Sequence, residues 1–260
     1  MEAKLNKDEV RAAYRKVAWV YDLWSGLTES KARRRCLEVA AIKNGESVLE
    51  VAVGTGILFE KILALNPTGR NEGIDLTEEM VTCARVRAQK SGVSGYDLRV
   101  GDAYHLENSD DSFDVVLNNY MFDLIPEKDF VVVLSEFRRV LRPGGRLVLV
   151  NMTTGAGWFN TVWEWLYTTW PSLLGGCRGI ELTPYVKEVG FEQVRREYVS
   201  QLFFPSEVIS GVKHQKERYR CTNHVSRLLA LSEKVHTVSH ATMTPLRCRR
   251  VDHAWSKEPR

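Results

Sequence analysis

Residues 47–56 read Ser-Val-Leu-Glu-Val-Ala-Val-Gly-Thr-Gly and predict a strand that runs into a glycine turn. The first seven residues are a short, valine-rich run, which is typical of a buried strand. The apolar spacing of residues 57–65 predicts a helix directly after the turn. A strand, a glycine turn and a helix form a general nucleotide-binding unit, because glycines let a ligand approach the backbone and helix amides face it.

The same alternation of strand and helix continues along the chain. Further strands are predicted at residues 71–76, 96–100, 113–118, 146–151, 192–199 and 205–212. Helices are predicted at residues 77–90, 128–141 and 183–189, with a turn at residues 142–145. Strands and helices at this spacing predict an α/β fold with a doubly wound, mostly parallel seven-stranded sheet covered on both faces.

Two helices are predicted before the first strand. Aromatic and aliphatic residues recur at helical spacing over residues 8–24, and Tyr21 lies on this apolar side. A second helix is expected over residues 28–42, with Thr28 as its N-cap. The run Arg33-Arg34-Arg35 in that helix is expected to face solvent.

The charge distribution separates a main domain from a tail. The net charge is +3, but residues 214–260 hold ten Lys and Arg against four Asp and Glu, and five of the six histidines. We therefore expect one domain over residues 1–213, with N-terminal helices in 1–44 and an inserted segment in 152–180. The basic, His-rich tail is expected to be poorly ordered, and the overall charge gives no reason to expect a nucleic-acid partner.

Metal binding and membrane insertion are not expected. His236 and His240 have the spacing of a zinc-finger histidine pair, but no paired cysteines precede them. The five cysteines are single, which indicates reduced thiols, and no apolar run approaches ~18 residues. The N-terminal residues lack the apolar core of a secretory signal. We expect the protein to be located in the cytoplasm, where peripheral contact with a membrane is compatible with the sequence.

The glycine turn does not match the common nucleotide fingerprints. A dinucleotide-binding turn requires a third glycine at position 59, where this sequence has Phe59. A P-loop requires Gly-Lys-Ser or Gly-Lys-Thr, which is absent.

The sequence instead resembles the class I S-adenosylmethionine (SAM)-dependent methyltransferases over roughly residues 10–213. Five segments carry the resemblance: Val48–Gly56, Gly73–Leu76, Gly101–Ala103, Phe113–Val116 and Leu141–Gly145. The segment Tyr14–Asp22 is similar to that of the ubiquinone and menaquinone biosynthesis subgroup. One position departs from the pattern, because Ala52 stands where many members have the first glycine.

The resemblance implies a Rossmann-like methyltransferase fold that binds SAM and releases S-adenosylhomocysteine (SAH). It implies that the turn residues Ala52, Gly54, Thr55 and Gly56 contact the methionine part of the cofactor. Asp75, at the end of the second strand, is expected to accept hydrogen bonds from both ribose hydroxyls.

The remaining expected cofactor contacts lie around the same strand ends. Asp102 and the Ala103 amide are expected to bind the edge of the adenine, and Leu76 and Met80 its faces. The other three are Glu50, Asn118 and Tyr21. Glu50 is expected to orient the turn or to bind the methionine ammonium through water. The backbone of Asn118 is expected to contact the cofactor amine, and Tyr21 to contact cofactor or substrate.

The acceptor side is less defined by the sequence. Seven large apolar residues between Trp158 and Trp170 form one wide helical stripe, which corresponds to the substrate lid of the resembling family. Such a stripe can line a pocket for a hydrophobic acceptor, rest on a membrane surface or pack against the sheet. No catalytic base is evident, and Tyr120 is a candidate only for substrate contact.

The expected function is methyl transfer from SAM to a hydrophobic small molecule, such as a quinone precursor or another lipophilic acceptor. Two alternatives remain: a phospholipid headgroup N-methyltransferase at the membrane surface and a non-catalytic protein that keeps the SAM-binding fold. A nicotinamide-dependent oxidoreductase is disfavoured by Phe59.

Overall fold

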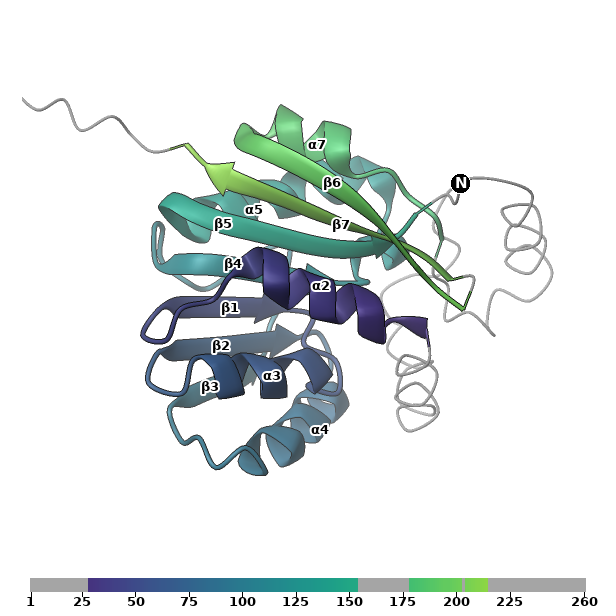
Figure 1. The fold of residues 1–260 in the computed structure, drawn as a ribbon. Coiled ribbons are helices and arrows are strands. Elements are labelled where there is room, and N and C mark those ends of the chain that lie inside the picture. The colour runs from purple at the N-terminus through teal and green to yellow at the C-terminus, as the bar shows by residue number, and fades with distance from the viewer. Residues whose placement is uncertain (1–27, 154–177, 203, 215–260) are drawn as a thin grey trace, which may run out of the picture. The chain divides into compact units, whose positions relative to one another are not determined.

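The computed structural model describes residues 28–153, 178–202 and 204–214, and within them seven strands form one sheet (Figure 1). The strands are β1 (Ser47–Val51), β2 (Arg70–Asp75), β3 (Tyr96–Val100), β4 (Phe113–Asn119), β5 (Leu141–Met152), β6 (Phe191–Gln201) and β7 (Phe204–Lys213). Their order is β3-β2-β1-β4-β5-β7-β6, and only β7 runs antiparallel to its neighbours. The predicted mostly parallel, seven-stranded α/β fold is thereby confirmed.

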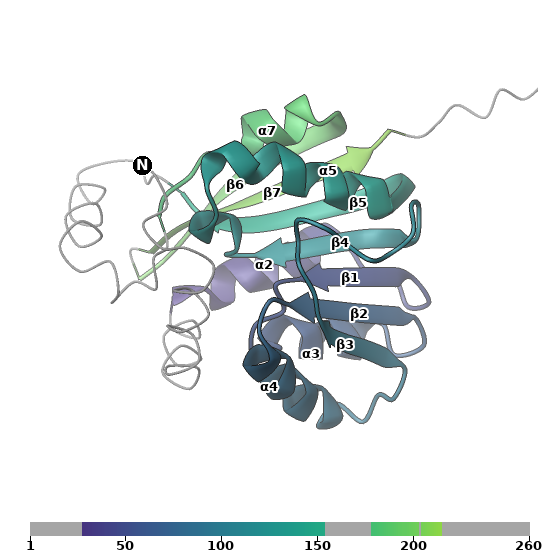
Figure 2. The same cartoon turned by 180° about the vertical axis from the view of Figure 1, so that it is seen from behind.

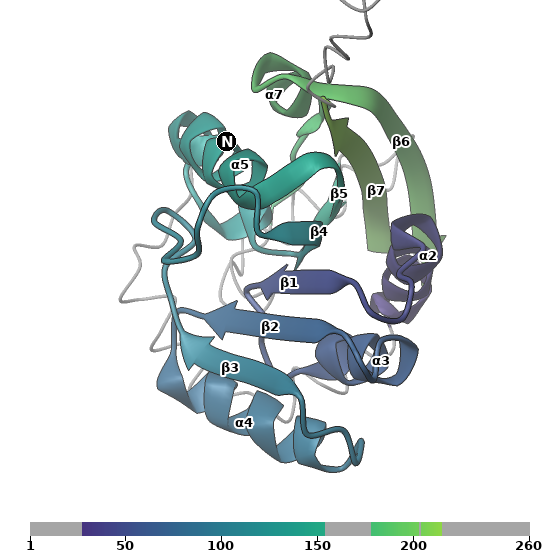
Figure 3. The same ribbon diagram turned by 90° about the vertical axis from the view of Figure 1, so that its left-hand side faces the viewer.

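Helices cover both faces of the sheet, as Figures 2 and 3 show. One face carries α2 (Ser30–Ala40), α3 (Ile57–Leu65) and α4 (Glu78–Gln89), whose apolar side chains share a core with alternate residues of the strands. The opposite face carries α5 (Phe130–Val140) and α7 (Thr183–Glu188), which pack on the remaining strand residues. Because both faces are covered, the central strands β1 and β4 are buried along almost their whole length.

The predicted elements recur close to their expected bounds, with two differences. Helix α2 begins at Ser30 rather than Thr28 and ends two residues early, because Ala41 adopts a left-handed conformation at φ 46°. The predicted turn at residues 142–145 belongs to the start of β5, where the register with β4 shifts and Gly144 has φ 82°.

One prediction about α2 is wrong. Arg33 was expected on the solvent-exposed face, but its side chain is 7% exposed and forms an ion pair with Glu29 at 2.9 Å. Position 33 lies one turn before Cys36, which belongs to the apolar core, so the helix carries the arginine inward with it. Arg34, by contrast, is exposed, as expected.

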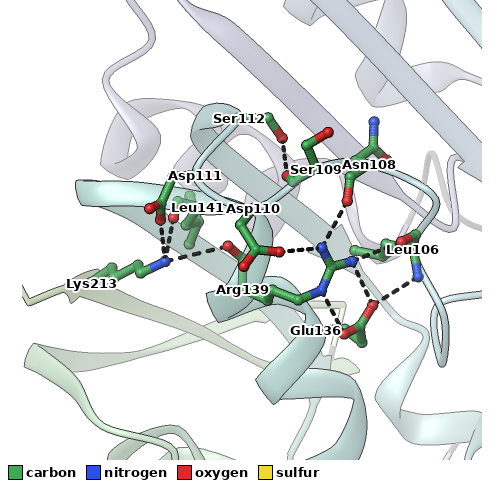
Figure 4. Close-up of polar contacts among 10 residues, drawn as sticks. All are labelled: Leu106, Asn108, Ser109, Asp110, Asp111, Ser112, Glu136, Arg139, Leu141 and Lys213. Atoms are coloured by element: carbon green, nitrogen blue, oxygen red, sulfur yellow. Dashed lines mark hydrogen bonds and ion pairs between the residues drawn. The ribbon is translucent and has the colours of Figure 1, made fainter.

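A polar network fixes the loop between β3 and β4 to α5 (Figure 4). The guanidinium of Arg139, near the end of α5, donates to backbone and carboxylate oxygens at 2.7–2.8 Å. Its acceptors are Leu106 O, Asn108 O, the Asp110 carboxylate and both Glu136 oxygens. The position of the loop therefore depends on one guanidinium, whose planar group donates several hydrogen bonds at once.

The end of β7 is fixed at the same place. The ammonium of Lys213 donates to Leu141 O at 2.6 Å and forms an ion pair with Asp111 at 2.6 Å (Figure 4). Strand β7, the last strand along the chain, is thus held to the start of β5 through its final residue, Lys213.

Several expectations concern residues outside the described part of the chain. These are the helix at 8–24 with Tyr21, the aromatic stripe at 158–170, and the tail with His236 and His240. The proposed domain limits, including the insertion at 152–180, also remain predictions. Within the described ranges, Ile180 N donates to Met152 O at 3.0 Å, so the two ends of that insertion meet.

Candidate cofactor site

A cavity of about 390 Å³ lies at the carboxyl ends of β1 to β4. The strand order reverses between β1 and β4, and crevices at such switch points are where open α/β sheets bind ligands. Its wall is made by the following residues: Val51, Ala52, Gly54, Ile74, Asp75, Leu76, Thr77, Met80, Gly101, Asp102, Ala103, Tyr104, Asn119, Tyr120, Met121, Leu124, Ile125, Pro126 and Asp129.

The turn after β1 places backbone along this cavity. Ala52, Gly54 and Gly56 have φ values of 58°, 55° and 81°, so the turn is built from left-handed residues. A Cβ on Gly56 would lie 2.8 Å from Ala84 Cα, so Gly56 is required for close packing of α3 on α4. A Cβ on Gly54 would meet no atom within 4 Å. Ala52 and Gly54 line the cavity, whereas Thr55 and Gly56 do not.

The Asp75 carboxylate joins three elements at the cavity wall. One oxygen accepts from Gly54 N at 2.9 Å, and the other accepts from Thr77 N at 3.1 Å and from Thr77 Oγ1 at 3.2 Å. Thr77 is the N-cap of α4, so Asp75 links the end of β2 to the glycine turn and to the start of a helix. Burial raises the pKa of Asp75, and these hydrogen bonds act in the opposite direction.

A second group of polar residues lies after β3. Asp102 accepts from Tyr104 N at 3.0 Å, and Tyr104 Oη donates to Asp129 at 3.0 Å. Both aspartates and Tyr104 line the cavity together with Ala103. The expected adenine contacts Leu76 and Met80 also lie in the wall.

At the end of β4, Asn118 and Asn119 differ in where their side chains lie, and the expected contact of the Asn118 backbone with the cofactor amine stays a prediction. Asn118 is buried and does not line the cavity, because its Nδ2 donates to Val51 O at 2.8 Å. Its neighbour Asn119 lines the cavity instead. The alternation of side chains along a strand separates these two adjacent residues, and the sequence alone did not identify Asn119.

Glu50 lies behind the turn, outside the cavity lining. Its side chain is 2% exposed, and burial raises its pKa well above the usual range, with Arg33 acting in the opposite direction.

Tyr120 follows β4 with φ 54°, a strained conformation for a non-glycine residue. Its backbone N donates to Val150 O at 2.7 Å, and its phenol oxygen lies 2.8 Å from Ser206 Oγ. The side chain lines the cavity, and burial, together with the nearby Glu29, raises the pKa of the phenol.

The charge of the described lining is entirely negative. It includes the carboxylates of Asp75, Asp102 and Asp129, and no Lys, Arg or His among the described residues. A pyrophosphate-bearing dinucleotide would meet three like charges there without a compensating cation. SAM carries a sulfonium and an ammonium against one carboxylate, and offers ribose hydroxyls and an apolar base. The lining therefore fits SAM and disfavours the nicotinamide alternative.

Within the described residues, no helix is long and apolar enough to cross a membrane. The described parts of the chain also contain no group of three or more side chains arranged to bind a metal ion.

The fold and the cavity define a class of nucleoside-binding α/β protein, and comparisons identify the family. The family model described as "Methyltransferase domain" matches residues 48–145. A phosphatidylethanolamine N-methyltransferase of Cereibacter sphaeroides is 37% identical over 149 residues, which cover 55% of this chain and 68% of that protein. The chain belongs to the class I SAM-dependent methyltransferases, and its cofactor is SAM.

Other relatives carry different names. An arsenite methyltransferase of Halobacterium salinarum is 34% identical over 60% of this chain and 39% of that protein. A demethylmenaquinone methyltransferase of Staphylococcus aureus is 31% identical over 57% of this chain and 62% of that protein. The chain thus spans less than two thirds of these two relatives.

Solved structures support the same fold. The magnesium protoporphyrin IX methyltransferase of Synechocystis, solved with bound SAH, has a TM-score of 0.56 at 17% identity. The match covers 81% of this chain and 89% of that chain.

Proposed function

We infer that the chain transfers the methyl group of SAM to a hydrophobic small molecule, with a quinone precursor as one candidate acceptor. The observation that carries this proposal is the cavity at the β1–β4 switch point, whose acidic lining suits SAM. Near Tyr120 the described wall is mainly apolar, with Met121, Leu124 and Ile125. The demethylmenaquinone methyltransferase among the relatives supports an acceptor of this type.

The cofactor supplies an activated methyl carbon, because the sulfonium is a good leaving group. The protein must then hold the acceptor in line with that carbon and exclude water. In this proposal Asp75 and the glycine turn hold the nucleoside and the methionine part of SAM. Leu76 and Met80 contact the base, which leaves the side near Tyr120 for the acceptor.

Tyr120 is proposed as the acceptor-side residue. Its left-handed backbone and the bond to Ser206 fix the phenol in the cavity wall. Replacement by phenylalanine keeps the ring and removes the polar atom. Tyr120→Phe is expected to lower methyl transfer about tenfold, the effect of one hydrogen bond in the transition state, without changing SAM affinity.

The test measures SAH formation from SAM with a panel of acceptors: a reduced isoprenoid quinol, a water-soluble catechol and phosphatidylethanolamine vesicles. Tyr198→Phe, a substitution of an exposed tyrosine on β6, serves as the matched control. Preferred turnover of the quinol supports the proposal. Turnover of the catechol at equal efficiency contradicts the hydrophobic acceptor, and equal rates for Tyr120→Phe and Tyr198→Phe remove Tyr120 from the site.

A phospholipid headgroup is the second candidate acceptor. The observation in its favour is the 37% identity to a phosphatidylethanolamine N-methyltransferase. In this case the vesicles, rather than the quinol, produce SAH, and Trp163→Ala weakens vesicle binding through the aromatic stretch. SAM binding without turnover of any acceptor favours the non-catalytic alternative.

A further inference from the structure

Strand β5 extends beyond the end of β4 at the edge of the cavity. The paired residues of the two strands end at Asn119 and Val150, and one further bond runs from Tyr120 N to Val150 O at 2.7 Å. Strand β5 continues to Met152, two residues beyond this last pair. Three cavity-lining residues come directly after the end of β4 and form what we call the acceptor-side wall: Met121, Leu124 and Ile125.

The side chain of Asp123 takes the place of β4 beside the end of β5. Asp123 is fully buried, and its Oδ2 accepts a hydrogen bond from Met152 N at 3.0 Å. Ile180 N donates to Met152 O at 3.0 Å, so backbone from a later segment completes the same edge. Because Asp123 lies in η1 (Phe122–Leu124), this one side chain attaches the acceptor-side wall to β5.

The environment of Asp123 favours an uncharged carboxyl group. Burial raises the pKa of Asp123 well above its usual range, and the nearby Glu29 and Glu207 act in the same direction. Met152 N and Arg178 act in the opposite direction. Among the described residues, Oδ1 has no hydrogen-bond partner, so the contact that the carboxyl supplies is the bond to Met152. An asparagine amide matches a neutral carboxyl in shape and keeps an oxygen that accepts this bond.

Arg178 attaches the other end of the same wall. Its side chain is buried, and Nη2 donates to Ile125 O at 2.7 Å. Its guanidinium carbon lies 6.0 Å from the centre of the Phe130 ring on α5. Next to Asp123, the Phe122 ring packs edge-on against Phe130 with 5.4 Å between the ring centroids. Separate contacts thus hold the wall to β5, to Arg178 and to α5.

We propose that Asp123 and Arg178 are positioning residues for the methyl acceptor. The proposal rests on the proposed function, in which the acceptor lies on the side of the cavity near Tyr120. Neither side chain lines the cavity, so both act through the wall. Asp123 fixes one end and Arg178 the other, which keeps Leu124 and Ile125 in place beside the acceptor. A displacement of about 1 Å can lower the rate of transfer about 100-fold, because the acceptor leaves its in-line position.

The test measures KM and kcat for the reduced isoprenoid quinol, and the dissociation constant of SAH, with the full chain. Asp123→Ala is expected to raise KM about tenfold, because the wall loses its attachment to β5. The dissociation constant of SAH is expected to stay within about twofold, because the proposed cofactor contacts of Asp75 are separate from this attachment. Asp123→Asn keeps the acceptor for Met152 N and is expected to restore the wild-type KM. A merely structural defect lowers the folded fraction, and with it the apparent kcat, without changing KM.

A second variant and two matched controls extend this test. Arg178→Met removes the donor to Ile125 O but keeps a long side chain, and it is expected to raise KM as well. Glu181→Ala and Arg195→Met replace an exposed acid and an exposed arginine that do not line the cavity. Both controls are expected to leave KM unchanged.

Hydrogen exchange followed by mass spectrometry tests the attachment without an acceptor. Asp123→Ala is expected to speed exchange of the amides in residues 119–126 about tenfold, because the wall opens more often. Exchange in the glycine turn, residues 52–56, is expected to stay at the wild-type rate.

The outcomes distinguish the proposal from the proposed function. Unchanged exchange in Asp123→Ala shows that the carboxyl does not hold the wall and overturns the proposal. Faster exchange with an unchanged KM, or a raised KM that Asp123→Asn does not restore, overturns the positioning role while the proposed function stands. An equal rise of KM in the control variants also overturns it. Absence of quinol turnover by a wild type that binds SAH overturns the proposed function, and the positioning role falls with it.

Discussion

The backbone nitrogen of Gly54 donates a 2.9 Å hydrogen bond to the carboxylate of Asp75. This bond joins the turn after β1 to the end of β2 across 21 residues of sequence. Because the other oxygen binds the N-cap Thr77, one carboxylate fixes the two backbone segments that flank the proposed nucleoside site. The arrangement accounts for an acidic residue at the end of β2, where a simple turn would not require one.

The turn after β1 contains a residue under strain. Ala52 has φ 58°, a conformation that costs a non-glycine residue about 1–2 kcal/mol. Glycine relieves this cost but loses more backbone entropy on folding, about 0.5–1 kcal/mol. Ala52→Gly is therefore expected to raise the free energy of unfolding by up to about 1 kcal/mol in urea denaturation.

The control for this substitution is Ala64→Gly, at an exposed position within α3. Glycine there is expected to lower the free energy of unfolding by about 1 kcal/mol, because position 64 is helical. A destabilised Ala52→Gly protein would contradict the strain assigned to the turn.

The buried pair of Glu29 and Arg33 predicts a pH dependence of stability. Burial raises the pKa of Glu29 from 4.5 to about 7, although Arg33 acts in the opposite direction. The folded state then keeps a proton that the unfolded state has released. The contribution of Glu29 to the free energy of unfolding is fully present below pH 4.5 and is lost as the pH rises through about 7. The loss amounts to about 3 kcal/mol.

Glu29→Gln removes this titration. The free energy of unfolding, measured in urea at pH 5 and pH 8, is expected to fall less between the two values for Glu29→Gln than for the wild type. If the free energy of unfolding falls equally in the two proteins between pH 5 and pH 8, Glu29 does not contribute to the pH dependence of stability.

The network around Arg139 predicts a difference between arginine and lysine (Figure 4). An ammonium cannot reproduce the planar fork that reaches Leu106 O, Asn108 O and the Glu136 carboxylate together. Arg139→Lys is expected to cost about 2 kcal/mol in the free energy of unfolding. Arg34→Lys, at an exposed position with a distant partner, is expected to change it by less than about 0.5 kcal/mol. Equal effects of the two substitutions would show that the network does not stabilise the loop.

The position of Lys213 predicts the effect of a truncation. The ion pair with Asp111 and the bond to Leu141 O complete the attachment of β7. A chain that ends at His214 is expected to keep the thermal midpoint of unfolding and the SAM affinity of the full chain. A thermal midpoint lower by more than about 5 °C corresponds to a loss of roughly 1–2 kcal/mol in the free energy of unfolding. Such a loss would show that part of the folded domain lies after residue 214.

The sequence predicted the order of elements well, because valine-rich runs and helical periodicity depend on local chemistry. The prediction for Arg33 was wrong because a run of three arginines usually faces solvent. The rotation of α2 about its own axis turns Arg33 toward the core, and the local sequence does not determine that rotation. Asn119 was missed because β4 extends one residue farther than predicted. The contact of Tyr104 with Asp129 joins residues 25 apart in the sequence and depends on loop geometry that no local pattern encodes.

In the proposed function, Asp75 and the glycine turn hold SAM. The most direct measurement is the calorimetric dissociation constant of SAM for the wild type, for Asp75→Ala, and for the control Asp97→Ala, an exposed carboxylate on β3. Wild-type binding that Asp75→Ala weakens by about 1–3 kcal/mol, with Asp97→Ala unchanged and both variants folded by circular dichroism, is the predicted result. No binding to the folded wild type, or equal binding to all three proteins, would contradict it.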